Sequence, residues 1–334
     1  MAYGTRADHP TAPASGAVTA APPRARLAAA AAALLVAGCG PGPSCCAPPS
    51  TPVPATTVTT SAGSAHGRKV LLVAEENHSY AQIIGNPDAG YLNRLATEYG
   101  TATRFDAGYP PACPSLAAYI LMTSGTAGGI CDDKSPEAHP LAGDNVFHQL
   151  TVRGGSWRNY AESAPHTCTL SNRGRYLVRH VPAAYYLDDR ADCAFAVVPL
   201  GDPGRGALHD DVTAGTLPDF AFVSPDACDD MHGADGCPAN LVATADGWLH
   251  TWLTQILAGP DYRSGHLVVM ITWDEGTETD NHIPMIVISP ATTRLAVGQP
   301  FTHCATLCTI EDLLRLRPLG CAATAASMTA PLRL

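Results

Sequence analysis

Three absences limit what this 334-residue chain can be. It lacks any block of like charge, because its 20 Lys and Arg are scattered among 30 Asp and Glu, for a net charge of −10. Nucleic-acid-binding surfaces are basic and clustered, so this pattern excludes a nucleic-acid partner. It lacks a Cys-x-x-Cys pair, which argues against a structural zinc site. Its apolar run Leu27–Gly38 is shorter than the ~20 residues that cross a bilayer.

The first 66 residues differ in composition from the rest of the chain. Leu27–Gly38 follows two arginines and has the character of the apolar part of an export signal. It ends in Leu35-Val36-Ala37-Gly38-Cys39, which resembles the lipobox of bacterial lipoproteins and implies cleavage before Cys39 and diacylation of its thiol. An ordinary signal peptide with a cysteine nearby is the alternative. We therefore predict an exported protein, either lipid-anchored at the outer face of the cell membrane or secreted.

Three regions follow from this composition. Residues 1–38 are predicted to be the export signal, and residues 39–67, rich in Pro, Ser and Thr, a flexible tether. Residues 68–334 are predicted to fold as one domain, and 46% hydrophobic residues over the whole chain suffice for a sizeable core.

The 12 cysteines fit an oxidising compartment. Closeness in sequence makes three disulfides plausible, but spacing alone does not fix connectivity. The pairs are Cys113 with Cys131, Cys168 with Cys193, and Cys228 with Cys237. Nine cysteines lie in the folded region, so one thiol is left free or pairs with the tether.

Apolar runs typical of strands alternate with helical patterns from Lys69 onward, which predicts an α/β domain with a mostly parallel sheet. The expected strands are 70–74, 219–224, 267–272 and 284–289, and the clearest helices are 244–257 and 306–315. Residues 163–215 show little periodicity and many Pro, Gly and Asp. They are predicted to be a loop-rich insertion that shapes the entrance to a site.

Polar residues follow two of these strands directly. Glu75-Glu76-Asn77-His78-Ser79-Tyr80 comes after the first strand, and Trp273-Asp274-Glu275-Gly276 after the third. Open α/β sheets bind ligands at the carboxyl ends of their strands, and oxygen ligands suit hard cations. The two runs therefore predict one metal site, while the alternative is a pair of polar turns.

Three further residues have positions that suit chemistry. Ser115 follows Pro114 at a predicted helix start, where it is either an N-cap or a nucleophile in the positive end of the helix dipole. His232 lies in the polar loop after Ser224 and either protonates a leaving group or belongs to a surface loop closed by a disulfide. His282 precedes the last strand and either reaches the same pocket or is an ordinary loop residue.

Taken in order, these runs resemble the bacterial phosphoesterase family of secreted acid phosphatases and phospholipases C. The likeness covers about residues 70–290 and is greatest to the actinobacterial branch that includes phosphatidylinositol-3-phosphatases. The matching runs are Glu76-Asn77-His78-Ser79-Tyr80, Tyr91-Leu92-Asn93, Pro114-Ser115-Leu116-Ala117-Ala118-Tyr119, Thr123-Ser124-Gly125, Asp230-Met231-His232, Thr272-Trp273-Asp274-Glu275, and Ile283-Pro284 through Ser289-Pro290.

The resemblance implies a three-layer α/β/α fold like that of alkaline phosphatase, with residues 68–334 as the catalytic domain. It implies a metal held by Glu76, Asn77, Asp274 and Glu275, for which Ca²⁺ or Mg²⁺ fits the oxygen ligands best. Ser115 would be the nucleophile and a further ligand. The resemblance also implies that His232 and His282 stabilise the phosphoryl group or the leaving oxygen. Asp230 and His78 are secondary candidates.

Three positions depart from the family pattern. Cys113 stands where a histidine usually precedes the Pro-Ser pair, Gly233 where an aspartate often follows the Met-His pair, and Asn281 where a glycine commonly precedes the later histidine. These departures leave every predicted ligand in place but bear on substrate preference.

The resulting prediction is a monomeric phosphomonoesterase acting on a phosphate ester such as a phosphoinositide. A phospholipase C is the first alternative, although only 6% of residues are aromatic and a choline pocket needs aromatic side chains. An inactive lipid-anchored binding domain is the second. A sulfatase is disfavoured, because Ser115 is not followed by the arginine of the sulfatase motif.

Overall fold

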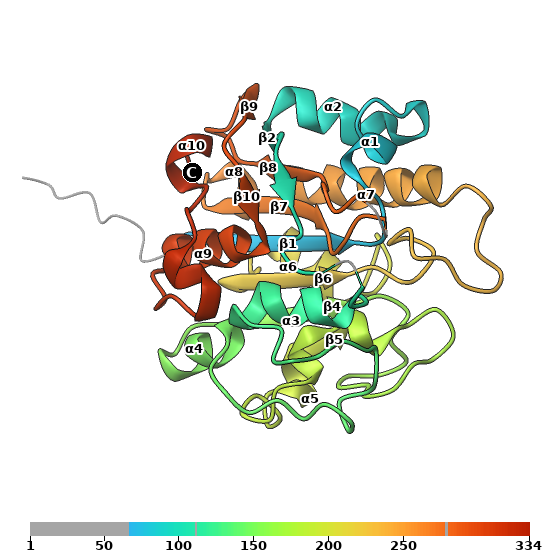
Figure 1. Ribbon diagram of the computed structural model, residues 1–334, viewed down its shortest axis with the longest axis vertical. Coiled ribbons are helices and arrows are strands. Elements are labelled where there is room, and N and C mark those ends of the chain that lie inside the picture. The colour runs from blue at the N-terminus through green and yellow to red at the C-terminus, as the bar shows by residue number, and fades with distance from the viewer. Residues whose placement is uncertain (1–66, 111, 278–279) are drawn as a thin grey trace, which may run out of the picture. The chain divides into compact units, whose positions relative to one another are not determined.

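The computed structural model describes residues 67–334 except residues 111, 278 and 279. An eight-stranded sheet forms the middle of this part of the chain (Figure 1). Its strands are, in spatial order, β5 (Val197–Pro199), β4 (Trp157–Ala161), β6 (Phe220–Ser224), β1 (Lys69–Glu75), β7 (Leu267–Trp273), β8 (Met285–Ile288), β2 (Gly100–Ala102) and β9 (Leu295–Val297). A separate two-stranded sheet pairs β10 (Phe301–Thr302) with β3 (Phe105–Asp106).

The large sheet is mostly parallel, as the sequence predicted. β1 runs parallel to both β6 and β7, and β4 runs parallel to β5 and β6. Only β8 is antiparallel to its neighbours β7 and β2. The carboxyl ends of β1, β4, β6 and β7 therefore meet at one edge of the sheet.

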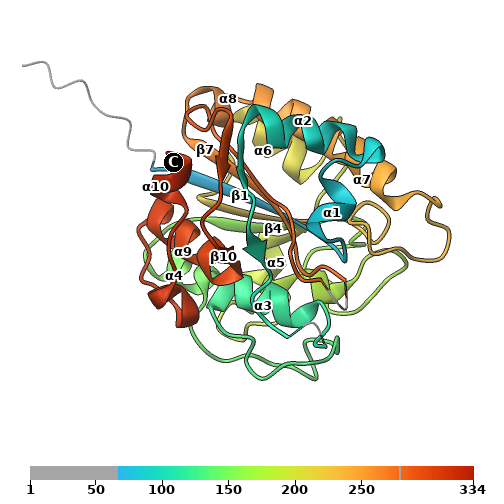
Figure 2. The same ribbon diagram turned by 45° about the horizontal axis from the view of Figure 1, so that its top comes forward.

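Helices cover both faces of the sheet, so the predicted three-layer α/β/α architecture is confirmed (Figures 1 and 2). The α-helices are α1 (Tyr80–Ile83), α2 (Gly90–Glu98), α3 (Leu116–Ser124), α4 (Val146–Val152), α5 (Cys193–Ala196), α6 (Ala207–Ala214), α7 (Leu241–Ala258), α8 (Pro260–Arg263), α9 (His303–Leu314) and α10 (Thr329–Leu332). The short 3₁₀ helices are η1 (Pro87–Ala89), η2 (Val178–His180), η3 (Pro182–Ala184) and η4 (Gly320–Thr324). Figure 2 shows α2, α6, α7 and α8 on one face and α3, α4 and α9 on the other.

The four predicted strands correspond to β1, β6, β7 and β8, whose residues are all buried. Burial on both faces explains their unbroken apolar runs. The other strands of the large sheet were missed because they are short or mixed. β4, for example, includes Arg158 and Asn159.

The two predicted helices are confirmed, and both begin three residues earlier than expected. α7 begins after Asn240, whose side chain accepts a hydrogen bond from the backbone N–H of Ala243 at 3.0 Å and so caps the helix. α9 begins after Thr302. The predicted insertion, residues 163–215, is largely irregular but also contains η2, η3, α5, β5 and α6.

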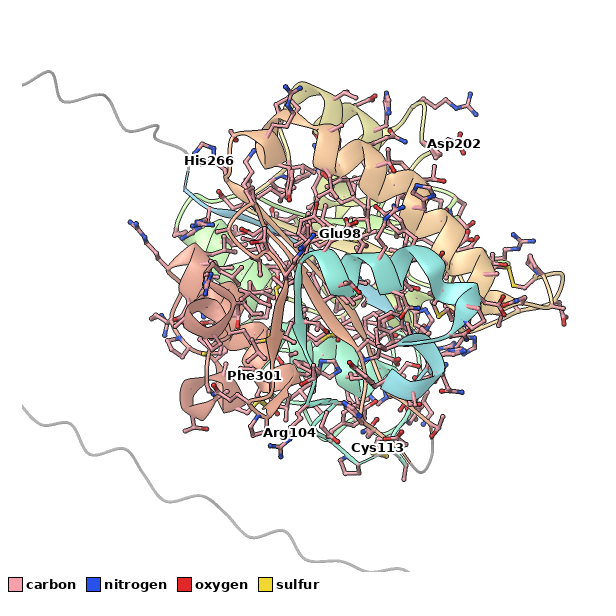
Figure 3. All side chains as sticks on the ribbon, turned by 90° about the horizontal axis from the view of Figure 1, so that it is seen from above. Glu98, Arg104, Cys113, Asp202, His266 and Phe301 are labelled. Carbon is pink, nitrogen blue, oxygen red and sulfur yellow. A yellow bond between two sulfur atoms is a disulfide. The ribbon has the colours of Figure 1, made fainter. Side chains whose placement is uncertain are left out.

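Four disulfides lie in the described residues, and three are the predicted pairs. They join Cys113 to Cys131, Cys168 to Cys193, Cys228 to Cys237 and Cys304 to Cys321. Figure 3 labels Cys113, which stands just before α3. The odd cysteine of the folded region is Cys308, which is free and buried.

The predicted export signal (residues 1–38), the lipidation site Cys39 and the tether (residues 39–67) lie outside the described residues, Gly67 excepted. Within the described part of the chain, no helix combines the length and apolar character needed to cross a membrane.

Candidate active site

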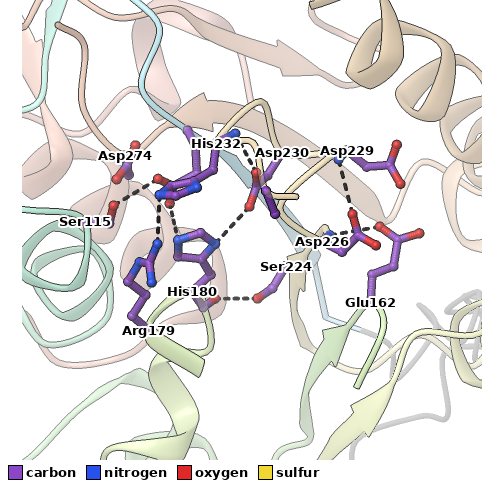
Figure 4. A network of polar contacts seen from close by, with 12 residues as sticks. Ser115, Glu162, Arg179, His180, Ser224, Asp226, Asp229, Asp230, His232 and Asp274 are labelled. Carbon is purple, nitrogen blue, oxygen red and sulfur yellow. Dashed lines mark hydrogen bonds and ion pairs between the residues drawn. The ribbon is translucent and has the colours of Figure 1, made fainter. Parts of the chain in front are cut away.

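The carboxyl edge of the sheet collects polar side chains from three parallel strands. Glu76 and Asn77 follow β1, Asp230 and His232 lie in the loop after β6, and Asp274 follows β7. Figure 4 shows the side chains of Ser115, Asp230, His232 and Asp274 gathered at this edge. Residues from distant parts of the chain thus lie together at this edge of the sheet.

Ser115 directs its hydroxyl into this group. It occupies the N-cap position of α3 but makes no side-chain capping bond. Its Oγ instead donates to Oε2 of Glu76 at 2.9 Å, and Nδ2 of Asn77 donates to the same oxygen at 3.2 Å. The backbone N–H of Asn77 donates to Oδ1 of Asp274 at 3.1 Å. The sequence left two roles open for Ser115, and its hydroxyl does not serve the capping role.

The N–H groups at the start of α3 already have partners. Leu116 donates to Oδ1 of Asp133 at 3.1 Å, and Ala117 and Ala118 donate to the carbonyl oxygens of Pro114 and Ser115. The helix dipole still favours negative charge at Ser115, but a phosphate would not find these amides free.

His180 joins two carboxylates and was missed by the sequence analysis. Its Nε2 lies 3.0 Å from Oε1 of Glu76, and its Nδ1 lies 2.8 Å from Oδ2 of Asp230. All three residues are at most 2% exposed. His180 comes from η2, inside the predicted insertion, and no local motif marks it. The ring of Tyr119 in α3 stacks on it with centroids 5.2 Å apart.

Arg179 supplies the positive charge of the site and was also missed. Its Nε lies 3.3 Å from Oδ2 of Asp133, and a terminal nitrogen lies 2.7 Å from Nε2 of His232. Since Nδ1 of His232 lies 2.8 Å from the carbonyl oxygen of Gly233, this ring donates at Nδ1 and accepts at Nε2 from the guanidinium. His232 thus orients Arg179 and carries no proton on the nitrogen that faces it.

Burial works against negative charge in the centre of the site. It is the main cause that raises the pKa values of Glu76, Asp230 and Asp274 well above their usual range, and the charges of neighbouring carboxylates add to it. Burial also lowers the pKa of His180, which is held neutral.

These groups fit a divalent cation. Three atoms of the site are buried without a hydrogen-bond partner: Oε1 of Glu76, Nε2 of His180 and Oδ2 of Asp274. The first two lie 3.0 Å apart but do not form a hydrogen bond. Ligand atoms of Glu76, His180 and Asp230 all lie within 4.8 Å of one another. A cation would offset the repulsion among the carboxylates and satisfy the orphaned atoms. The imidazole adds a nitrogen to the oxygen donors expected from the sequence.

Three residues predicted to belong to the site contact atoms other than the side chains of Ser115 and Glu76. Oε2 of Glu275 accepts from the hydroxyl of Tyr109 at 2.9 Å, beside Asp274. The ring of His282 stacks on Tyr80 and its Nε2 lies 3.0 Å from the carbonyl oxygen of Thr103, so its contacts are not with Ser115. Nδ1 of His78 lies 3.0 Å from the backbone carbonyl oxygen of Glu76.

A model of the Phosphoesterase family matches residues 86–317, and the chain belongs to this family. The match spans α2, the Ser115 helix, the insertion with Arg179 and His180, and the loops after β6 and β7. The family predicted from the sequence is confirmed.

Two curated relatives carry the names of phosphatases. The chain is 26% identical over 264 residues to a phosphatidylinositol-3-phosphatase of Mycobacterium tuberculosis, covering 78% of this chain and 81% of that protein. It is 24% identical over 191 residues to a phosphate-repressible acid phosphatase of Penicillium chrysogenum, covering 55% of this chain and 43% of that protein. The prediction of a phosphoric monoester hydrolase agrees with both names.

The fold agrees with a solved structure from the alkaline phosphatase superfamily. That protein, from Vibrio parahaemolyticus, superposes with a TM-score of 0.50 at 11% identity, covering 75% of this chain and 67% of its own. The predicted fold class is confirmed by this likeness, which concerns the fold alone.

Proposed function

We propose that this protein is an exported, metal-dependent phosphomonoesterase with Ser115 as its nucleophile. The observation that carries the proposal is the placement of the Ser115 hydroxyl at the start of α3. It makes no capping bond and donates to buried Glu76 at 2.9 Å, beside His180, Asp230 and Asp274. Membership of the Phosphoesterase family supports it.

The chain's own residues supply positioning and charge. Glu76 accepts the hydrogen of the Ser115 hydroxyl, which turns an oxygen lone pair toward phosphorus. Attack by Oγ passes the hydroxyl proton to Glu76, forms the Oγ–phosphorus bond and breaks the bond to the leaving alkoxide, which takes a proton from solvent. Water then cleaves the phosphoserine and releases phosphate. Arg179, held by Asp133 and His232, would offer its remaining N–H groups and its positive charge to the phosphoryl oxygens.

A divalent cation bound by Glu76, His180 and Asp230, with Asp274 and Asn77 adjoining, would lower the pKa of the Ser115 hydroxyl and neutralise phosphoryl charge. Ca²⁺ or Mg²⁺ remains our proposal for the oxygen-rich set, and activity with each added metal decides its identity. His282 is proposed to act only indirectly, since its ring contacts Tyr80 and Thr103.

The relatives and the disulfides support the proposed substrate class and location. The name of the mycobacterial relative favours a phosphorylated inositol lipid or a similar small phosphate ester. Four disulfides favour an oxidising compartment, and we retain export through residues 1–38 and lipidation of Cys39 as proposals. A monomer is also proposed.

Hydrolysis of p-nitrophenyl phosphate between pH 4 and 9 tests the proposal. Activity should disappear with chelator and return with added divalent metal. Ser115→Ala and Asp274→Ala should each lower kcat by at least about a thousandfold while the circular dichroism stays unchanged. Near-normal turnover in either folded variant overturns the site assignment. Hydrolysis of a phosphodiester but not of a monoester overturns the activity.

A further inference from the structure

A second group of carboxylates lies at the same edge of the sheet as the candidate active site, but on the opposite face of the sheet. Successive residues of a strand point to opposite faces, so Glu75 and Glu76 leave the end of β1 in opposite directions. Glu76 reaches Ser115 on the α3 face. The opposite face is covered by α7, and the negative charge of Asp246 in this helix is one of the causes that raise the pKa of Glu75.

The core of this group consists of Glu162, Asp226 and Asp229, which come from the ends of β4 and β6. One ligand oxygen from each lies within 4.8 Å of the others. Figure 4 shows the three side chains together, to one side of the Ser115 network. The backbone N–H of Asp226 donates to Oε2 of Glu162 at 2.9 Å, and the hydroxyl of Ser163 donates to Oδ2 of Asp226 at 2.7 Å. These bonds fix the carboxylates but do not neutralise them.

Glu75 is the independent sign of a missing ligand. It is 0% exposed, and both of its carboxylate oxygens are buried without a hydrogen-bond partner. Glu75 and Glu162 stand at the same level on the two sides of β6, because Val73 of β1 pairs with Val223 and Ala161 of β4 pairs with Ser224, so both side chains lie on the same face of the sheet. A carboxylate buried without donors is costly unless a proton or a cation accompanies it.

In the described residues, no cationic side chain forms an ion pair with these carboxylates. None of Glu75, Glu162, Asp226 and Asp229 belongs to an ion pair there. Arg175 lowers the pKa of Asp229, but its guanidinium donates to the carbonyl oxygen of Gly236 at 3.1 Å. In the part of the chain that the structure describes, the group therefore holds up to four negative charges that no ion pair neutralises.

We propose that Glu162, Asp226 and Asp229, backed by Glu75, form a second divalent-cation site of the calcium type. Its donors are all oxygen, unlike the mixed set around His180, and carboxylate-rich oxygen sites are those that Ca²⁺ prefers. Glu162 and Asp229 are only partly buried, so an ion can enter from solvent.

The site would fasten the loop after β6 to the ends of β1 and β4. This loop also holds Asp230 of the candidate active site. The N–H groups of Asp229 and Asp230 donate to the backbone carbonyl of Asp226, and the N–H of Glu76 donates to that of Asp230. The ion would thus position the active-site loop without touching substrate. This inference does not depend on which ester the enzyme hydrolyses.

Terbium luminescence tests the site, because Tb³⁺ replaces Ca²⁺ and emits when a nearby indole is excited. Nε1 of Trp248 donates to Oε1 of Glu162 at 2.8 Å, so the indole touches a proposed ligand. Tb³⁺ added to the full-length protein should emit on tryptophan excitation, and excess Ca²⁺ should displace it. Asp229→Asn should weaken binding by about tenfold or more, since ligand charge sets affinity in such sites. The exposed Asp235→Asn, in the same loop, is the matched control and should bind normally.

Two further variants separate this site from the active site. Asp274→Asn should keep the Trp248-sensitised emission, while Trp248→Phe should keep calorimetric Ca²⁺ binding but lose most of that emission. Ca²⁺ should raise the melting temperature of the wild type and of Asp235→Asn, and not that of Asp229→Asn. If Asp229→Asn does not fold, the Trp248→Phe comparison decides alone.

The alternative is that the carboxyl groups share protons. In that case Ca²⁺ changes neither emission nor melting temperature, and Asp229→Asn is more stable than the wild type without any cation. Either that result or unaltered Tb³⁺ binding in folded Asp229→Asn overturns the proposal, while activity of the Ser115 site is measured separately.

Discussion

Arg179 and His180 complete the candidate active site from one short 3₁₀ helix. They are neighbours in η2, yet one contacts Asp133 and His232 while the other joins Glu76 and Asp230. Glu76 and Asp274 follow recognisable strands, whereas η2 lies in an aperiodic segment. Nothing in the local sequence distinguishes this arginine from others in the insertion.

Replacing Arg179 tests its assigned role. Arg179→Lys keeps the charge but loses the planar fork that matches phosphate, so kcat/KM should fall by about a hundredfold. Steady-state kinetics with p-nitrophenyl phosphate measure this. Arg173→Lys, an exposed position in the same insertion, is the control and should behave like wild type. Equal kinetics for the two variants would contradict a phosphate-binding role.

At the scale of elements, α3 is fixed at both ends by contacts from distant residues. At its start, the Cys113–Cys131 disulfide closes the segment that contains Ser115, and Asp133 accepts the N–H of Leu116. Cys113 is the departure from the family pattern, and here it has a structural role. At its end, Gly125 adopts a φ of +73° and lies against Leu319. The position of the Ser115 hydroxyl depends on these contacts.

Gly125→Ala should destabilise the protein more than an alanine at another glycine of similar backbone conformation. An added Cβ would lie 2.3 Å from the carbonyl oxygen of Leu319, and that oxygen belongs to the backbone and cannot rotate away. We expect a loss of roughly 2–4 kcal/mol from left-handed strain and overpacking together.

Gly129→Ala is the matched control, with a φ of +76° and nothing within 4 Å of the added Cβ. It should cost about 1–2 kcal/mol from backbone strain alone. Urea denaturation of both variants measures the difference. Equal losses would mean that the contact with Leu319 does not constrain the end of α3.

At the scale of the whole described domain, buried acidic side chains outnumber the buried basic ones. Burial raises the pKa of Glu275 to about 7, that of Glu162 to about 8 and that of Glu311 to about 7. Such groups bind more protons in the folded state, so their contribution to stability falls as pH rises from the unfolded value toward the folded one. His303 acts in the opposite sense, because burial lowers its pKa to about 4.

With chelator present, the melting temperature should therefore fall as pH rises from about 4.5 to about 8, because the raised carboxyls outnumber the histidines. Added divalent cation should flatten this slope, since it compensates the ionised carboxylates directly. Scanning calorimetry across this range measures both curves.

Glu311→Gln provides a control for the pH dependence. Glu311 lies in α9 and accepts the N–H of Leu319, away from both carboxylate clusters. Replacing Glu311 should reduce the slope of melting temperature against pH by the same amount with and without added cation. A chelated protein that becomes more stable from pH 5 to pH 7 would contradict the assigned shifts.

The sequence alone determined the α/β class with its mostly parallel sheet, the central strands and the family, because each depends on local runs of residues. It made three disulfides plausible, and the structure decided their connectivity. Buried parallel strands are apolar throughout, and the polar residues that follow them must share one edge of the sheet. Glu76 and Asp274 were found in this way and Ser115 from its place at a predicted helix start, and the three lie together in the structure.

Only the tertiary structure decided which other groups meet them. His180 and Arg179 join from an aperiodic insertion, and the rings of His282 and His78 take other partners. The separation of Glu75 from Glu76 into two clusters depends on which helix covers each face of the sheet. These outcomes depend on contacts between residues far apart in the chain, and short-range patterns do not encode such contacts.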